Sequence, residues 1–312
     1  MASGARRCAL AAGLALLAVA AAPAGGASPP RCYGAASRDP LHPCQNPALR
    51  QMVVPSPAEA AILPNSPCDP VPETTPYTCS FGSPAADASD TVALVGDSHA
   101  TSWRAALRTV ASREHWHAIS ITRSSCPFTR ATPVLPEPAR SQCVDWNNQV
   151  TGFIAAHPEI STVFVAQHRG HVVVPTGADP RAAQIRGYLA AWRGLPVTVQ
   201  HVIVIRDTPY DRSHTAACVE RALQRRLEPG VVCAIPRAKA LKPDPAAAAA
   251  GRMRGSRVGL IDMTHYMCSS ALCYPVVGGV LVHKDINHLG ETFGATLGPY
   301  MLRAVNRLVG SA

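Results

Sequence analysis

The stretch that decides the fold of this chain is Thr91-Val92-Ala93-Leu94-Val95-Gly96-Asp97-Ser98-His99. Four consecutive apolar residues before a turn-forming glycine predict a buried strand that ends at Gly96. Apolar residues then recur at helical spacing from Trp103 to Ala111, which predicts a helix. A serine at such a turn lies beside the free N–H groups of the helix, which suits a nucleophile. Asp97 and Ser98 are also ordinary N-cap residues, so this stretch alone leaves both interpretations open.

The first 27 residues predict a signal peptide. Arg6 and Arg7 form a charged region, Ala9–Ala22 is apolar, and small residues up to Ala27 predict cleavage before Ser28. The apolar run is short for a bilayer span, although an uncleaved anchor is the alternative. We find no second apolar stretch of membrane-spanning length. We therefore expect an exported protein, secreted or associated with the cell envelope, with no transmembrane span beyond the signal segment.

The charge pattern argues against nucleic acid as a partner. The 312 residues carry a formal net charge of +9, but the basic residues are scattered and no run is longer than Arg225-Arg226. A scattered excess fits an anionic surface such as a cell envelope better than it fits nucleic acid, for which a basic stripe is typical. A solvated basic surface without a partner is the alternative.

Ten cysteines follow the predicted signal peptide. The oxidising compartment that an exported protein enters permits them to form disulfides. The simplest pairing joins neighbours along the chain: Cys32-Cys44, Cys68-Cys79, Cys126-Cys143, Cys218-Cys233 and Cys268-Cys273. A zinc site is the alternative, but no CxxC is present and no histidine is spaced beside a cysteine like a ligand. His168 and His171 lack an obvious carboxylate partner in the sequence. We therefore expect no metal site, and without a nucleotide-binding loop we expect no cofactor.

Two regions follow the signal segment. Residues 28–90 are rich in proline and hold four cysteines, which predicts a disulfide-pinned extension. Residues 91–312 alternate strand and helix patterns, which predicts an α/β domain with a parallel sheet covered on both faces. The expected strands are 91–96, 117–122, 162–166, 199–205 and 258–261. The expected helices run to 114 from the first turn and then cover 143–156, 178–193, 216–227, 239–253 and 291–308.

A base for Ser98 is found near the other end of the chain. In parallel sheets, sites lie at the carboxyl ends of the strands, where Ser98 is expected. A serine nucleophile needs a histidine and an orienting acid. Asp285-Ile286-Asn287-His288 stands directly before the last expected helix, and a carboxylate three residues before a histidine can reach its Nδ1. The alternative is that Asp285 caps a turn and His288 opens the helix.

Several motifs together resemble the SGNH, or GDSL-like, hydrolase family. They are Val92–Ala100, Ser124–Pro127, Asp207–Pro209, Asp285–Leu289, the cysteines Cys268 and Cys273, and the approach Cys79–Gly82. The resemblance is greatest to the SGNH domain that follows the membrane acyltransferase-3 domain in bacterial envelope O-acyltransferases. It implies a three-layer α/β/α (flavodoxin-like) SGNH-hydrolase fold with a parallel central sheet. It also implies an acyl-serine mechanism with Ser98 as nucleophile, His288 as base and Asp285 as its orienting acid.

The chain departs from this family at the oxyanion hole. The family uses the serine N–H, a glycine after the second strand and an asparagine after the third. Here the corresponding positions hold Arg123-Ser124-Ser125 and Gln167-His168-Arg169. The candidate donors are the backbone N–H of Ser98, a backbone N–H near Ser125, and the side chain of Gln167 or Arg169.

The expected function is therefore serine-dependent O-acyl chemistry, with acetyl as the expected group. The enzyme would be an esterase or acyltransferase that acts on cell-envelope or secreted glycans through an acyl-Ser98 intermediate. Its partners would be an acyl ester or glycan and, in one version, a separate membrane acyltransferase. The alternative is a non-catalytic glycan-binding or accessory module that keeps the fold.

Overall fold

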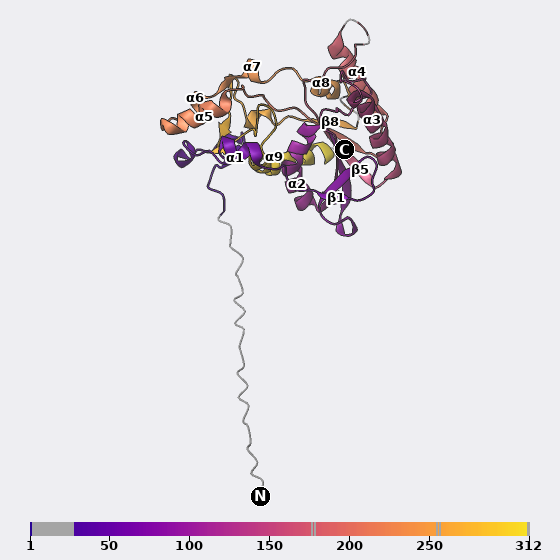
Figure 1. Ribbon diagram of the computed structural model, residues 1–312, viewed down its shortest axis with the longest axis horizontal. Helices are drawn as coiled ribbons and strands as arrows, with labels where there is room; N and C mark the ends of the chain where they lie inside the picture. The colour runs from indigo at the N-terminus through magenta and orange to yellow at the C-terminus, as the bar shows by residue number, and fades with distance from the viewer. Residues whose placement is uncertain (2–27, 176, 178, 254, 256, 311–312) are drawn as a thin grey trace. The chain divides into compact units, whose positions relative to one another are not determined.

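The computed structural model describes Met1 and residues 28–175, 177, 179–253, 255 and 257–310 (Figure 1). Apart from Met1, the predicted signal segment 1–27 lies outside the described residues. The chain divides into two compact units, Met1–Pro30 and Arg31–Ala312, and everything below concerns the second.

A seven-stranded sheet organises the second unit, in the order β1-β2-β4-β3-β5-β6-β8. The last five strands in this order are parallel, and β1 and β2 add an antiparallel edge. The parallel strands follow the 2-1-3-4-5 order of flavodoxin-like sheets. The strands are β1 (Asp69–Val71), β2 (Thr78–Gly82), β3 (Asp90–Gly96), β4 (Trp116–Thr122), β5 (Ile160–Ala166), β6 (His201–Ile205) and β8 (Val258–Ile261).

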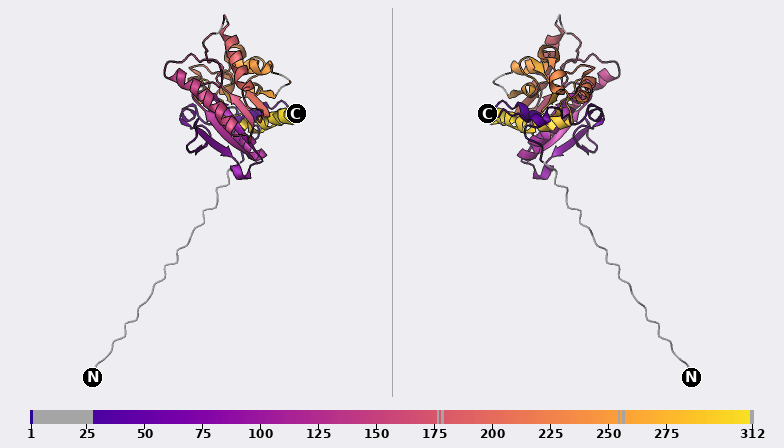
Figure 2. Two further views of the ribbon diagram at one scale, coloured as in Figure 1. Left: turned by 90° about the vertical axis from the view of Figure 1, so that its right-hand side faces the viewer. Right: turned by 90° about the vertical axis from the view of Figure 1, so that its left-hand side faces the viewer.

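Helices cover both faces of the sheet. Successive residues of a strand point to opposite faces, so each buried strand gives apolar side chains to both faces. Val92 and Leu94 of β3 pack against α2 (Ser98–Glu114) and α9 (Glu291–Val309). Ala93 and Val95 face the other core, beneath α3 (Ala139–Ala156), α4 (Pro180–Arg193) and α8 (Pro245–Gly251). Figure 2 shows α9 in yellow and α3 in magenta on opposite sides of the sheet. The predicted α/β fold with three layers is confirmed.

Shorter elements complete the unit, and α1, α5 and α6 lie together on the side away from α3 and α4 (Figure 1). The α-helices are α1 (Pro57–Ile62), α5 (Thr215–Gln224), α6 (Pro229–Val232) and α7 (Arg237–Ala240). The strands are β7 (Ile235–Pro236), β9 (Leu272–Cys273), β10 (Val276–Val277) and β11 (Val280–Leu281). The 3₁₀ helices are η1 (Gly34–Arg38), η2 (Pro47–Leu49), η3 (Ala85–Asp87) and η4 (Thr264–Tyr266). Within the described part of the chain, no helix has both the length and the apolar character that a bilayer span requires.

Residues from Arg31 onward form one compact unit, in which β2 of the predicted extension 28–90 pairs with β4. One helix predicted from the sequence is wrong. The helix expected over 239–253 is split into α7 and α8, because a proline lacks the N–H that a helix interior requires. Pro245 instead occupies the first turn of α8, and Asp244 caps that turn by accepting from the N–H of Ala246.

The ten cysteines that follow residue 27 form five disulfides between neighbours along the chain. The pairs are Cys32–Cys44, Cys68–Cys79, Cys126–Cys143, Cys218–Cys233 and Cys268–Cys273. Cys79 lies in β2 and Cys68 immediately before β1, so their disulfide links the start of β1 to β2. Another, Cys126–Cys143, ties the loop after β4 to α3.

Candidate active site

The turn between β3 and α2 presents Ser98. Gly96 has φ +148°, and a Cβ there would lie 1.8 Å from the carbonyl oxygen of Ala166, so only glycine fits. Asp97 is the N-cap of α2, and its Oδ1 accepts from the N–H of His99 at 2.8 Å. Ser98 is therefore the first residue of the helix, where its N–H lacks an intrahelical acceptor and the helix dipole is positive.

A tight loop before α9 carries the partners of Ser98. The loop closes on itself through a hydrogen bond from the Lys284 N–H to the carbonyl of His288 (3.0 Å). The Asp285 carboxylate accepts from the backbone N–H of Asn287 (2.9 Å) and of His288 (2.8 Å). These contacts fix the carboxylate and the imidazole on the same short segment.

Ser98, His288 and Asp285 form a serine–histidine–aspartate triad. The Ser98 Oγ donates to the Nε2 of His288 at 2.8 Å, and the Nδ1 of His288 donates to Asp285 at 2.7 Å. Burial raises the pKa of Asp285, but the hydrogen bonds from His288 and from the backbone outweigh it and hold the pKa well below its ordinary value. The carboxylate is therefore ionised at neutral pH, and it holds the imidazole of His288 by a charge-assisted hydrogen bond.

A family model matches most of this chain. The model of the SGNH domain fused to AT3 domains matches residues 67–303. The chain belongs to this family. The family predicted from the sequence motifs is therefore confirmed.

A solved structure shows the same fold as this SGNH domain. The periplasmic domain of a lipopolysaccharide acetyltransferase from Salmonella ser. Paratyphi A superposes with a TM-score of 0.54 and 12% sequence identity. The match covers 70% of this chain and 84% of that one. A search of curated proteins finds no match.

A second histidine–aspartate pair lies behind the triad of the SGNH domain. The Nδ1 of His99 donates to Asp207 at 2.6 Å, and both side chains are buried. The ring of His99 lies 4.8 Å from that of His288, centroid to centroid. Burial lowers the pKa of His99, but Asp207 and other nearby carboxylates outweigh it and raise the pKa. Sequence reasoning missed this pair, because its members are 108 residues apart. The signals were that Asp207 lies just after a strand and that both residues lie in motifs that resemble the SGNH family.

Asp97 and Asp207 also hold the loop after β5. Asp97 accepts from the N–H of His168 (2.9 Å) and from the Nε2 of His171, and Asp207 accepts from the N–H of Arg169 (2.9 Å). Burial and the neighbouring His99 lower the pKa of His168 to about 4. His171 thus has a carboxylate partner that its sequence neighbourhood did not reveal. The described residues contain no group of three or more histidines, cysteines or carboxylates arranged to hold a metal.

The oxyanion candidates differ in their surroundings. Ser98 lies at the helix N-terminus, and Ser125 is exposed in the turn after β4 with φ +61°. Gln167 is buried, and its Oε1 accepts from the N–H of Phe128 at 3.0 Å. This leaves the Nε2 of Gln167 buried without a hydrogen-bond partner among the described residues. The Nε2 group of Gln167 is therefore a hydrogen-bond donor without an acceptor among the described residues.

Arg169 is occupied elsewhere. Its guanidinium donates to the carbonyl of Thr208 and, at 2.8 Å, to that of Ala240, and it lies 3.3 Å from the centre of the Tyr210 ring. These contacts fasten the loop after β5 to the loop after β6. The structure therefore gives Arg169 a supporting position and leaves Ser98, Ser125 and Gln167 as the oxyanion candidates.

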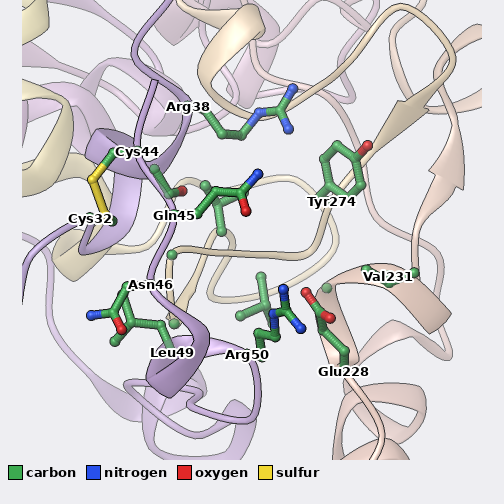
Figure 3. Close-up of a pocket in the computed structure, with 16 residues that line it drawn as sticks. Cys32, Arg38, Cys44, Gln45, Asn46, Leu49, Arg50, Glu228, Val231 and Tyr274 are labelled. Atoms are coloured by element: carbon green, nitrogen blue, oxygen red, sulfur yellow. A yellow bond between two sulfur atoms is a disulfide. The ribbon is translucent and has the colours of Figure 1, made fainter. Parts of the chain in front are cut away.

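A cavity elsewhere in the unit Arg31–Ala312 is lined by no triad residue. Its volume is about 340 Å³, and it lies where the segment around the Cys32–Cys44 disulfide meets α6 (Figure 3). Arg38, Arg50, Glu228 and Tyr274 surround it, so both signs of charge are present. The lining of this cavity therefore carries both positive and negative charge.

Proposed function

We propose that this SGNH domain is an extracytoplasmic serine enzyme that cleaves or transfers O-acyl groups, acetyl first among them, on cell-envelope or secreted glycans. One observation carries the proposal: the Oγ of Ser98 lies 2.8 Å from a histidine nitrogen whose other nitrogen is held by a carboxylate. A nucleophile within hydrogen-bond reach of a base, which is oriented by a third group, is the arrangement that acyl transfer requires.

The proposed reaction has two halves. The Ser98 Oγ attacks the ester carbonyl while His288 takes its proton, and collapse of the tetrahedral intermediate breaks the ester bond. The leaving alcohol receives the proton from His288, and the acyl group remains on Ser98. Water or a sugar hydroxyl then attacks the acyl-serine, gives its proton to His288, and releases the acid or the new ester as Ser98 regains its proton.

Two observations support an extracytoplasmic setting and a membrane partner. Five disulfides fit an oxidising compartment. The family model describes SGNH domains fused to AT3 domains, and the similar solved structure is a periplasmic domain. We infer that a membrane acyltransferase supplies the acyl group where the reaction is transfer, and that water is the acceptor where it is hydrolysis.

The test is hydrolysis of 4-nitrophenyl acetate by the purified, disulfide-bonded protein. We expect turnover in the wild type and a loss of three or more powers of ten in kcat in both Ser98→Ala and His288→Ala, since triad members act as a unit. Ser141→Ala, an exposed serine on α3, is the matched control and should retain wild-type turnover. Equal turnover in the wild type and Ser98→Ala, or none in the folded wild type, would instead favour a non-catalytic glycan-binding module.

A further inference from the structure

A second cavity is lined in part by the loops after β5 and β6, and most of its charged lining residues are basic. It has a volume of about 410 Å³. Its charged lining residues are Arg169, Arg212, Lys239, Lys242 and Asp211. This makes four basic groups against one carboxylate, in contrast to the mixed charges in Figure 3.

The charges of this cavity are not equally available to a ligand. The Asp211 carboxylate lies 3.3 Å from the Nδ1 of the buried His283, and Arg169 is buried with its guanidinium bound to carbonyl oxygens. Arg212, Lys239 and Lys242 are exposed. Lys242 donates one hydrogen bond, to the carbonyl of Ala238 at 3.0 Å, and an ammonium has three N–H groups. The cavity therefore presents two lysines and one arginine to solvent, whereas the side chain of its one carboxylate, Asp211, is largely buried against His283.

Two contacts connect the cavity to the triad. The Asp211 N–H donates to the carbonyl of Ile286 at 2.8 Å, and Ile286 lies between Asp285 and His288. The hydroxyl of Tyr210, which also lines the cavity, donates to Asp207 at 3.1 Å. The backbone of Asp211, which lines the cavity, is therefore hydrogen-bonded to the loop that carries His288.

We propose that this cavity binds an anionic group, a carboxylate or a phosphate, on the glycan whose ester reaches Ser98. Lys239, Lys242 and Arg212 hold the anion by charge-assisted hydrogen bonds, and the buried Ile235 with Pro243 forms the apolar part of the lining. The role of the anion in the reaction rests on the proposed function, but the binding does not. The inference gives the substrate a chemical class: an acidic glycan.

Binding is tested without catalysis. Calorimetry measures the Kd of two probes, trigalacturonate for carboxylates and glucose 6-phosphate for phosphate, with neutral maltotriose as reference. We expect one charged probe or both to bind and maltotriose to bind at least tenfold more weakly. Lys239→Gln/Lys242→Gln should raise the Kd of the charged probe at least about tenfold, because each lost charge-assisted hydrogen bond costs roughly that factor in affinity.

A charge-matched variant separates the cavity from general attraction. Arg50→Gln/Arg193→Gln also removes two positive charges, one from the cavity of Figure 3 and one from the exposed end of α4. We expect its Kd to stay within about twofold of the wild type. The proposal is overturned if neither charged probe binds or if maltotriose binds as well as they do. It is also overturned if the Kd of the charged probe rises by the same factor in both double variants.

A kinetic experiment tests the link to the reaction. We expect kcat/KM to be higher for acetylated polygalacturonate than for acetylated xylan, and the lysine double variant to lower the ratio of the two at least about fivefold. Unchanged selectivity in that variant contradicts a substrate role for the cavity. If the protein hydrolyses neither polymer nor 4-nitrophenyl acetate but still binds the charged probe through the lysines, the proposed function fails and the binding site stands.

Discussion

Ser98 and His288 come together from positions 190 residues apart, and each is set by its own short motif. Ser98 is fixed by the turn that Gly96 permits and Asp97 caps, and His288 by the loop that Asp285 organises. Because each motif is local, sequence reasoning could find its residues. Their meeting depends on β3 and the loop before α9 lying at the same edge of the sheet, which the α/β pattern also predicted.

Other residues around the triad could not be predicted, because their partners are distant and carry no local motif. His99, at the start of α2, is hydrogen-bonded to Asp207, which lies just after β6. His171, in the loop after β5, is hydrogen-bonded to Asp97. In the sequence each of these histidines looked like a local or solitary side chain. Arg169 was one of the candidate oxyanion donors, but a strand-end position alone does not show which carbonyl groups a long side chain will contact.

Gln167 is the residue at which the oxyanion hypothesis is tested. Gln167→Met keeps the volume but removes the Nε2 donor, so we expect kcat on 4-nitrophenyl acetate to fall by about two powers of ten. The lost bond to Phe128 should lower the free energy of unfolding by only about 1 kcal/mol.

Asn147→Leu provides the control, since the buried Oδ1 of Asn147 accepts from the N–H of Thr129 in the same loop at 2.8 Å. Urea unfolding and kcat are measured for both variants. If both lose stability alike and neither changes kcat, Gln167 supports the loop and is not an oxyanion donor.

At the scale of elements, the parallel strands and most helices were predictable, because apolar periodicity specifies them directly. The strand at Val258–Ile261 begins and ends where the sequence pattern predicts. The antiparallel edge was missed, because β1 and β2 are short and lie in a proline-rich, cysteine-rich region whose pairing partners are far along the chain. Their position depends on the exposed edge of β4, which no local pattern in residues 28–90 reveals.

The β3–α2 turn is the element on which the site depends most. In Gly96→Ala, the new Cβ would meet the backbone of Ala166, which belongs to the neighbouring strand and cannot move aside cheaply. We expect the free energy of unfolding to fall by about 3 kcal/mol or more, measured by urea denaturation.

Gly152→Ala is the matched control for this element. Gly152 lies inside α3 with open space around its Cα, so the same change should be neutral or stabilise by up to about 1 kcal/mol. Similar stabilities for the two variants would show that the turn does not require glycine.

At the scale of the whole molecule, two histidines with shifted pKa values, His168 and His99, make the stability of the fold depend on pH. The pKa of His168 is lowered to about 4, so the unfolded chain binds a proton there between about pH 6.5 and 4 while the folded one does not. The stability from this group is present above about pH 6.5 and is lost as the pH falls to about 4. The raised pKa of His99 acts oppositely, since its contribution is lost as the pH rises above about 6.5.

We therefore expect the free energy of unfolding to be largest near pH 6.5 and to fall on both sides. Urea denaturation from pH 4 to 9 measures this profile. His168→Gln should flatten the acid side and His99→Gln the alkaline side. A profile that His168→Gln leaves unchanged would contradict the burial of that neutral imidazole.

The most direct test of the central claim is to ask which atom of the folded protein reacts with an acyl-transfer probe. The intact protein is treated with a fluorophosphonate, digested, and analysed by mass spectrometry. We expect one adduct per chain, on Ser98, with labelling at least about a hundredfold slower in His288→Ala because the base is gone. The absence of an adduct on Ser98 in the folded protein, or an equal labelling rate without His288, would contradict it.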